Sequence, residues 1–356
     1  MRPVRPAFSS LQHQKNAYHR GSARWLTGLL AAALFGLLAG CASTFDLQGH
    51  RGARGLAPEN TLAAFDTALA VGVTTLELDI AISADKVAVI SHEQALYEAF
   101  TRDAQGQWLA TRGPLIKNLS VAQLQTYDVG RLNPNAPYAK PFAGQQPSDG
   151  ERIPTLAALF ERVKALGAQP VRFNIETKIF PDRPDDTVGP DEFVDVVLAT
   201  IRQAGMTGRV SLQSFDWRTL QRAQKLAPEI PTVYLSFENQ RFSNLVDGSW
   251  SAGLKKADFS SVPHMVKAAG GRVWSPNFNN LSQPDLKTAQ SLGLQVIPWT
   301  VNGPDDMDRL LQWGVDGLIT DFPDRLRERL QLRGMALPRA YAAEVLALPR
   351  VPAPRP

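Results

Sequence analysis

The stretch TLELDI, residues 75–80, alternates apolar and acidic side chains and decides the fold. In a β-strand successive side chains point to opposite faces, so its three apolar residues share one face while Glu77 and Asp79 share the other. Unpaired buried charges carry a prohibitive free-energy cost, so the acidic face needs a cation or other charged partners. We therefore expect a strand whose apolar face packs on helices and whose acids point into a barrel, near its carboxyl-terminal mouth.

Around this stretch, short segments rich in β-branched residues alternate with longer helical patterns, which is typical of parallel βα units. Strands are predicted at residues 47–50, 74–80, 86–91, 171–176, 209–214, 232–236, 295–300 and 317–320. Helices are predicted at residues 62–71, 155–166, 192–203, 217–226, 284–292 and 305–313. Eight such strands predict an α/β fold, a (β/α)8 TIM barrel. Residues 272–275 form another extended segment, which we interpret as part of the connection after the sixth strand.

The barrel is predicted to occupy residues 47–334. A long inserted loop after the third strand, at about residues 93–153, is expected over the barrel mouth, because connections of that length are usually functional or disordered. Residues 335–356 are rich in Pro and Ala and are predicted to form a flexible tail.

The amino-terminal segment predicts an export signal. A basic start precedes the apolar run WLTGLLAAALFGLLAG at residues 25–40, which is shorter than the roughly 20 residues of a membrane span and ends in small residues. Cys41, the single cysteine, follows directly, and LAGC at residues 38–41 resembles the bacterial lipobox. We predict a lipoprotein signal peptide at residues 1–40, lipidation of Cys41 and an anchor linker at residues 41–46.

Two further expectations follow from this segment. Residue 42 is Ala rather than Asp, which by resemblance to lipoproteins favours the periplasmic face of the outer membrane. The first forty residues hold five of the 38 basic residues and no acid, which leaves 33 basic against 34 acidic residues in the remainder. A mature chain with a net charge of about −1 gives no electrostatic support for binding nucleic acid.

A second acidic strand indicates a metal site. In FNIETK, residues 173–178, Glu176 and Lys178 share a face. Glu77, Asp79 and Glu176 together offer the oxygen ligands that Ca²⁺ or Mg²⁺ prefers, whereas a structural zinc site would need more Cys and His than the chain provides. The alternative is that these acids pair with Arg or Lys at the barrel rim.

Two histidines at predicted strand ends, His50 and His92, are candidates for a general base and a general acid. Their ordinary pKa of about 6.5 suits proton transfer near neutrality. Arg51 and Lys178 are expected to bind an anion such as phosphate. His264 lies in a polar connection without such neighbours and is given no role.

The segment GHRGARGLAPENT, residues 49–61, surrounds the first of these histidines. Its glycines allow a sharp turn and a close approach to a ligand. Glu59 or Asn60 is expected to orient His50 or Arg51 from behind. A histidine and an arginine at a strand end, beside an acidic cage, fit metal-assisted phosphoryl transfer.

The ordered motifs GHRG, APENT, ELDI, VAVISH, ERIPTL, FNIETK, SLQSF, PWTVN and GVDGLITD resemble the glycerophosphodiester phosphodiesterase family. The resemblance implies a TIM barrel that hydrolyses glycerophosphodiesters to an alcohol and glycerol 3-phosphate. It implies metal ligation by Glu77, Asp79 and Glu176, acid-base catalysis by His50 and His92, phosphate binding by Arg51 and Lys178, and Trp299 as a wall for the substrate. Glu93 and Thr177 depart from the family pattern, which usually has Asp and Ile there.

Two other functions stay open on the sequence. One is a phospholipase D-type phosphodiesterase acting on lysophospholipids or sphingolipids, which would share the same His, acid and Trp residues. The other is a surface lipoprotein that binds phosphodiester head groups without turnover. The preferred head group, the bound ion, the histidine that acts as base and the oligomeric state are not indicated by the sequence.

Overall fold

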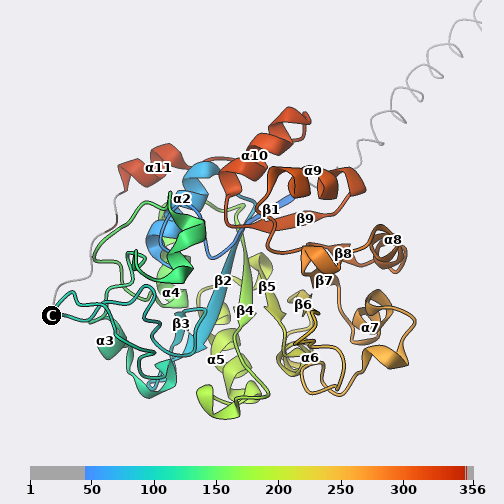
Figure 1. Cartoon of the computed structure of the whole chain (residues 1–356), viewed down its shortest axis with the longest axis horizontal. Helices are drawn as coiled ribbons and strands as arrows, with labels where there is room; N and C mark the ends of the chain where they lie inside the picture. The colour runs from blue at the N-terminus through green and yellow to red at the C-terminus, as the bar shows by residue number, and fades with distance from the viewer. Residues whose placement is uncertain (1–44, 349, 351–356) are drawn as a thin grey trace, which may run out of the picture. The chain divides into compact units, whose positions relative to one another are not determined.

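The computed structural model describes residues 45–348 and residue 350, and its core is a nearly closed barrel of eight parallel strands (Figure 1). The barrel strands are β1 (Asp46–Gly49), β2 (Thr75–Ile82), β4 (Arg172–Thr177), β5 (Val210–Ser214), β6 (Thr232–Ser236), β7 (Val273–Pro276), β8 (Gln295–Val296) and β9 (Gly317–Thr320). Their hydrogen-bonded order is β8-β7-β6-β5-β4-β2-β1-β9, so the first and last strands lie side by side. The predicted (β/α)8 fold is confirmed.

The barrel closes at the short strand β8 by backbone hydrogen bonds outside the regular ladders. The amide of Asp316 donates to the carbonyl of Val296, and the amide of Ile319 donates to the carbonyl of Pro298, both at 3.0 Å. The predicted strand at residues 295–300 therefore follows the barrel wall, although only its first two residues have regular strand pairing.

Helices alternate with the strands and surround them (Figure 1). They are α2 (Leu62–Val71), α4 (Leu156–Ala165), α5 (Pro190–Gln203), α6 (Trp217–Leu226), α7 (Val262–Ala268), α8 (Gln283–Ser291), α9 (Pro304–Trp313) and α10 (Pro323–Leu332). Threonine hydroxyl groups cap the amino-terminal ends of two helices. The Thr61 side chain accepts a hydrogen bond from the backbone amide of Ala64 in α2, and the Thr155 side chain accepts one from the backbone amide of Ala158 in α4. The main hydrophobic core fills the layer between the outer strand faces and these helices.

The prediction of a barrel strand at residues 86–91 was wrong. The segment predicted at residues 86–91 contains β3 (Ala88–Ile90), which pairs antiparallel with β2 and lies outside the barrel order. Only residues 83–87 separate β3 from β2, and a parallel crossover needs a dozen or more residues. The pair is therefore a hairpin, and the long insertion follows an accessory strand rather than the third barrel strand.

The segment that we interpreted as part of a connection is the missing barrel strand. Residues 273–276 form β7, which pairs in parallel with both β6 and β8. The short helix α7 before it supplies the crossover. Two opposite errors thus gave the correct total of eight.

The insertion has a small core of its own. It contains α3 (Val121–Leu124) and a 3₁₀ helix at Pro137–Phe142. Its buried apolar residues pack with two residues of the β2–β3 hairpin in one cluster: Ala81, Val89, Leu96, Ile116, Leu124, Val129 and Ile153. This cluster fixes the segment that follows His92.

The end of the described chain packs on the barrel rather than forming the loose tail predicted from residue 335. Helix α11 (Ala342–Ala347) contacts α2. The side chain of Tyr341 is buried, and its amide donates to the carbonyl of Leu69 at 2.9 Å. Cys41 and the predicted signal peptide lie outside the described residues. Within residues 45–348 and 350, no helix combines the length and the apolar character needed to cross a membrane.

Candidate active site

Three carboxylates meet inside the barrel, as the strand alternation predicts. All eight residues of β2 are buried, and its register places Asp79 beside Glu176 of β4. One oxygen from each of Glu77, Asp79 and Glu176 lies within 4.8 Å of the others. The cluster can hold a metal ion, because buried oxygen ligands at this spacing suit a hard divalent cation.

The environment of these carboxylates fits a cation. Burial, with the nearby charge of Asp79, raises the pKa of Glu77 well above its ordinary value. Burial also raises the pKa of Glu176 to about 7, although Lys178 opposes the shift. Among the described residues, the buried Oδ1 of Asp79 has no hydrogen-bond partner. A cation between the three groups would relieve their repulsion and provide that partner.

Side chains below and behind the cluster hold it in place. The side-chain amide of Gln213 donates to Glu77 Oε1 at 2.6 Å, and the backbone amide of Arg51 donates to Glu77 Oε2 at 2.8 Å. The Asn60 side chain donates to Asp79 Oδ2 at 2.9 Å. Of the two residues expected to orient His50 or Arg51, Asn60 thus orients this carboxylate.

His50 follows β1 directly and is held by an aspartate. Its Nδ1 lies 2.6 Å from Oδ1 of Asp321, which follows the neighbouring strand β9. Burial lowers the pKa of His50, although Asp321 opposes that shift. Burial by itself would raise the pKa of Asp321. The charges and hydrogen bonds of His50 and Arg54 together outweigh this effect and hold the pKa well below its ordinary value, so the carboxyl stays ionised. Its charge keeps the other ring nitrogen of His50 directed at the cleft.

His92, which follows β3, has a matching contact with a carboxylate. Its Nδ1 lies 2.7 Å from Oε1 of Glu93. The glutamate that replaces the usual aspartate of the family pattern therefore still contacts the histidine. Burial, together with the charges of Arg51 and Lys178, lowers the pKa of His92 well below its ordinary value. Each histidine therefore keeps one ring nitrogen free of the carboxylate, and that nitrogen can take or give a proton in the cleft.

The two histidines line one cleft of about 180 Å³. Its other walls include Arg51, Arg54, Glu77, Glu176, Lys178, Phe215 and Trp299. The structure therefore gathers the predicted histidines, both predicted cations, two of the three acids and Trp299 around one space. Asp79 lies behind this surface.

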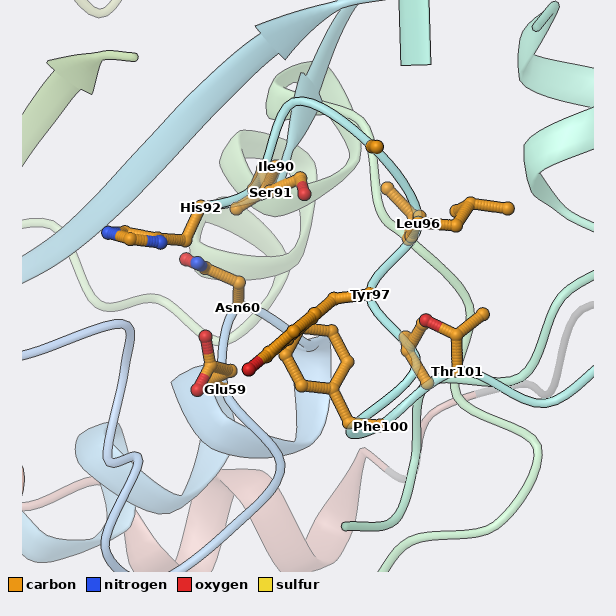
Figure 2. Close-up of a pocket in the computed structure, with 12 residues that line it drawn as sticks. Glu59, Asn60, Ile90, Ser91, His92, Leu96, Tyr97, Phe100 and Thr101 are labelled. Carbon is orange, nitrogen blue, oxygen red and sulfur yellow. The ribbon is translucent and has the colours of Figure 1, made fainter. Parts of the chain in front are cut away.

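A small cavity behind His92 is separate from the cleft. It lies between Asn60, Tyr97 and Phe100 and has a volume of about 20 Å³, which is room for one water molecule. Figure 2 shows the imidazole of His92 pointing away from the Tyr97 and Phe100 rings. The reactive side of His92 thus faces the larger cleft.

The turn after β1 presents Arg51 to the cleft. Arg51 has a φ of 50° and Gly52 a φ of 84°, both in the left-handed region. A Cβ on Gly52 would lie 2.6 Å from the carbonyl carbon of Ala64, so this position requires glycine. Glu59 accepts from Arg51 Nη1 at 2.6 Å, as expected for a residue that orients Arg51.

Sequence reasoning missed several residues of this site, among them Asp321, Arg54 and Tyr138. Asp321 receives two hydrogen bonds from Arg54, at 2.8 and 2.9 Å, besides its contact with His50. Tyr138, from the insertion, donates to Glu59 and accepts from Arg51 at 3.3 Å and Arg54 at 3.1 Å. The position of Asp321 directly after a strand, like that of His50, was a usable signal. Tyr138 offered none.

Thr177, the second residue that differs from the family pattern, has its side chain directed away from the cleft. Thr177 is buried, and its hydroxyl lies 2.8 Å from that of Thr219 in α6. Because side chains alternate along β4, Thr177 faces the helices while Glu176 and Lys178 face the barrel interior. The Lys178 ammonium lies 2.9 Å from Glu176, so having Thr177 in place of the usual Ile does not displace Lys178 from the site.

Comparison with known proteins agrees with this geometry. The model of the glycerophosphoryl diester phosphodiesterase family matches residues 50–325. YhdW of Bacillus subtilis, named as a candidate glycerophosphodiester phosphodiesterase, is 30% identical over 77% of this chain and 93% of its own. A glycerophosphodiester phosphodiesterase of the same organism is 28% identical over 77% of this chain and 83% of its own.

A solved structure shares the whole fold. The crystal structure of a candidate glycerophosphoryl diester phosphodiesterase from Silicibacter pomeroyi superposes with a TM-score of 0.74 and 35% identity. The similarity covers 83% of this chain and 96% of that one. The protein described here therefore belongs to the glycerophosphoryl diester phosphodiesterase family.

Proposed function

We propose that the protein hydrolyses glycerophosphodiesters to an alcohol and glycerol 3-phosphate, with a divalent cation, Ca²⁺ or Mg²⁺, as cofactor. The observation that carries the proposal is the pair of carboxylate-held histidines facing one cleft beside the acid cluster. A head-group-binding protein would not need two such titrating groups.

In this reaction the charged residues bind the phosphate and the histidines move protons. Arg51 and Lys178 attract the phosphate oxygens into the cleft. One histidine takes a proton from the nucleophile as its P–O bond forms, and the other protonates the alkoxide as the P–O bond to the leaving alcohol breaks. The nucleophile is water, or the neighbouring glycerol hydroxyl, which gives a cyclic phosphate that water then opens to glycerol 3-phosphate. Bound at Glu77, Asp79 and Glu176, the cation would supply Lewis-acid stabilisation of phosphate charge.

The direct test measures release of glycerol 3-phosphate from glycerophosphocholine and glycerophosphoethanolamine by the purified protein, with Ca²⁺, Mg²⁺ or a chelator. Cation-dependent release is expected. Turnover of lysophosphatidylcholine or sphingomyelin alone would favour the phospholipase D-type reaction. Saturable binding of the diesters without product would indicate a binding role.

Tyr138→Phe is expected to lower kcat/KM by about tenfold. The substitution removes the hydroxyl that holds Glu59, Arg51 and Arg54 together, and hydrogen bonds to charged groups are worth about 1.5–3 kcal/mol. Initial rates over a range of substrate concentrations would measure the loss. Tyr127→Phe, in the same insertion, is the matched control. An unchanged kcat/KM in Tyr138→Phe would mean that the arginines need no support from the insertion.

We also propose that the protein is an exported bacterial lipoprotein, anchored through Cys41 to the periplasmic face of the outer membrane. The basic start, the short apolar run and the lipobox-like LAGC support this proposal. Labelled palmitate should enter the wild-type protein and not Cys41→Ser, and the labelled protein should fractionate with outer membranes. Equal labelling of both proteins would refute attachment at Cys41.

A further inference from the structure

A second cavity of about 180 Å³ adjoins the catalytic cleft. Its walls are mainly five aromatic rings, which we call the aromatic lobe: Phe180, Phe215, Phe237, Phe242 and Trp250. His92, Glu176, Lys178 and Phe215 line both cavities, so the lobe opens directly onto the reacting centre. A phosphodiester has two arms, and a phosphate bound at this boundary can place one arm in each cavity.

The lobe is built before any ligand arrives. Phe180, Phe215 and Phe237 follow the carboxyl ends of three neighbouring strands, β4, β5 and β6. The Trp250 ring packs edge-on against the Phe180 and Phe242 rings, with centroids 5.6 and 5.4 Å apart. A preformed wall of this kind loses little conformational freedom when it binds a ligand.

Buried hydrogen bonds fix the loop that carries Phe242 and Trp250. The fully buried Asn244 side chain accepts from the amide of Phe237 at 2.9 Å and donates to the carbonyl of Leu235 at 3.0 Å. The carbonyl of Trp250 accepts from the amide of Trp217, at the start of α6, at 2.7 Å.

The chemistry of the walls selects the arm that enters. Away from the boundary with the cleft, the lining residues are Ile179, Phe180, Phe237, Phe242 and Trp250, and none has a side-chain oxygen. A primary ammonium group would lose its hydrogen bonds to water there without replacement. A quaternary ammonium group has no N–H to satisfy, and aromatic faces attract its spread positive charge.

The charged residues at the boundary leave room for such a cation. Lys178 Nζ lies 5.8 and 5.7 Å from the centroids of Phe180 and Phe215, and the Arg183 guanidinium carbon lies 4.1 Å from that of Phe180, so both rings already face a positive charge. The Lys178 charge is paired with Glu176 at 2.9 Å. Phe237, Phe242 and Trp250 are the rings that remain for a ligand. We propose that the aromatic lobe binds a quaternary ammonium alcohol as the second arm, so that choline diesters are the preferred substrates.

This inference rests on the proposed function and is tested with three glycerol phosphate diesters: those of choline, ethanolamine and 3,3-dimethylbutanol, the neutral carbon isostere of choline. The kcat/KM for the choline diester should exceed that for the ethanolamine diester by about tenfold or more. It should also be higher than the kcat/KM for the diester of the neutral isostere. Equal values for choline and ethanolamine, or a neutral isostere as good as choline, would overturn the lobe assignment and leave the proposed function intact. Hydrolysis of none of the three would contradict both.

A matched pair of variants places the preference in the lobe. Phe242→Leu keeps an apolar side chain but removes one ring face, so the choline-to-ethanolamine ratio should fall severalfold. Phe259→Leu makes the same change in the same long loop, at a half-buried residue outside the lobe, and should leave the ratio unchanged. An unchanged ratio in Phe242→Leu would refute a role for that ring.

Discussion

Replacing His92 with alanine is expected to lower kcat by about 10²–10⁴-fold, the usual contribution of general acid-base catalysis. The ring lies in the wall of the catalytic cleft, and its Nδ1 is occupied by Glu93, so the other nitrogen is the one that serves the reaction. The same loss is expected for His50→Ala, which leaves Asp321 with its hydrogen bonds from Arg54 and Asn302. Initial rates of glycerol 3-phosphate release at saturating substrate would measure both.

Cation affinity separates this role from general damage to the site. Neither histidine belongs to the acid cluster, so calorimetric titration with Ca²⁺ or Mg²⁺ should give nearly the wild-type affinity for both variants. His264→Ala is the matched control, because that histidine is exposed on α7 and contacts Ser261. Full activity in His92→Ala would contradict the assignment outright.

Glu176→Gln is expected to abolish most of the cation dependence of both activity and thermal stability. Glu176 offers one of the three clustered oxygens, and its pKa is raised from 4.5 to about 7, chiefly by burial. A folded-state pKa above the unfolded value contributes stability that is full below pH 4.5 and lost as the pH rises through about 7. Bound cation opposes this loss, so its effect on Tm should grow between about pH 5 and pH 8.

Thermal unfolding of the wild type and Glu176→Gln, with cation and with chelator at both pH values, provides the measurement. Glu161→Gln removes an exposed carboxylate from α4 and should retain the full cation effect. If the cation raised Tm equally at the two pH values, or raised it equally in Glu176→Gln, the acid cluster would not be the cation site.

Alternation along the strands made much of this site predictable. The pattern of β2 placed Glu77 and Asp79 on the inner face, and the same pattern in β4 placed Glu176 and Lys178 beside them. Residues directly after a parallel strand gather at one barrel end, which is why His50 could be identified from its place in the chain.

What the sequence did not predict depends on contacts between distant segments. The three apolar residues of β3 fit a barrel strand or a hairpin arm equally well, and only the length of the preceding turn separates the two. His92 therefore reaches the cleft from an accessory strand and not from the barrel. Tyr138 lies in an irregular insertion, where no periodic pattern relates a residue to the site.

The contact between His50 and Asp321 spans 271 positions of the chain. A partly synthesised chain can fold some of its βα units, but it cannot assemble this pair until β9 has left the ribosome and paired with β1. Contacts of such long sequence separation also slow folding, because the closure entropy of the loop is lost before the contact forms. Catalytic competence should consequently be among the last properties that a newly made chain acquires, and fragments that end before residue 321 should be inert.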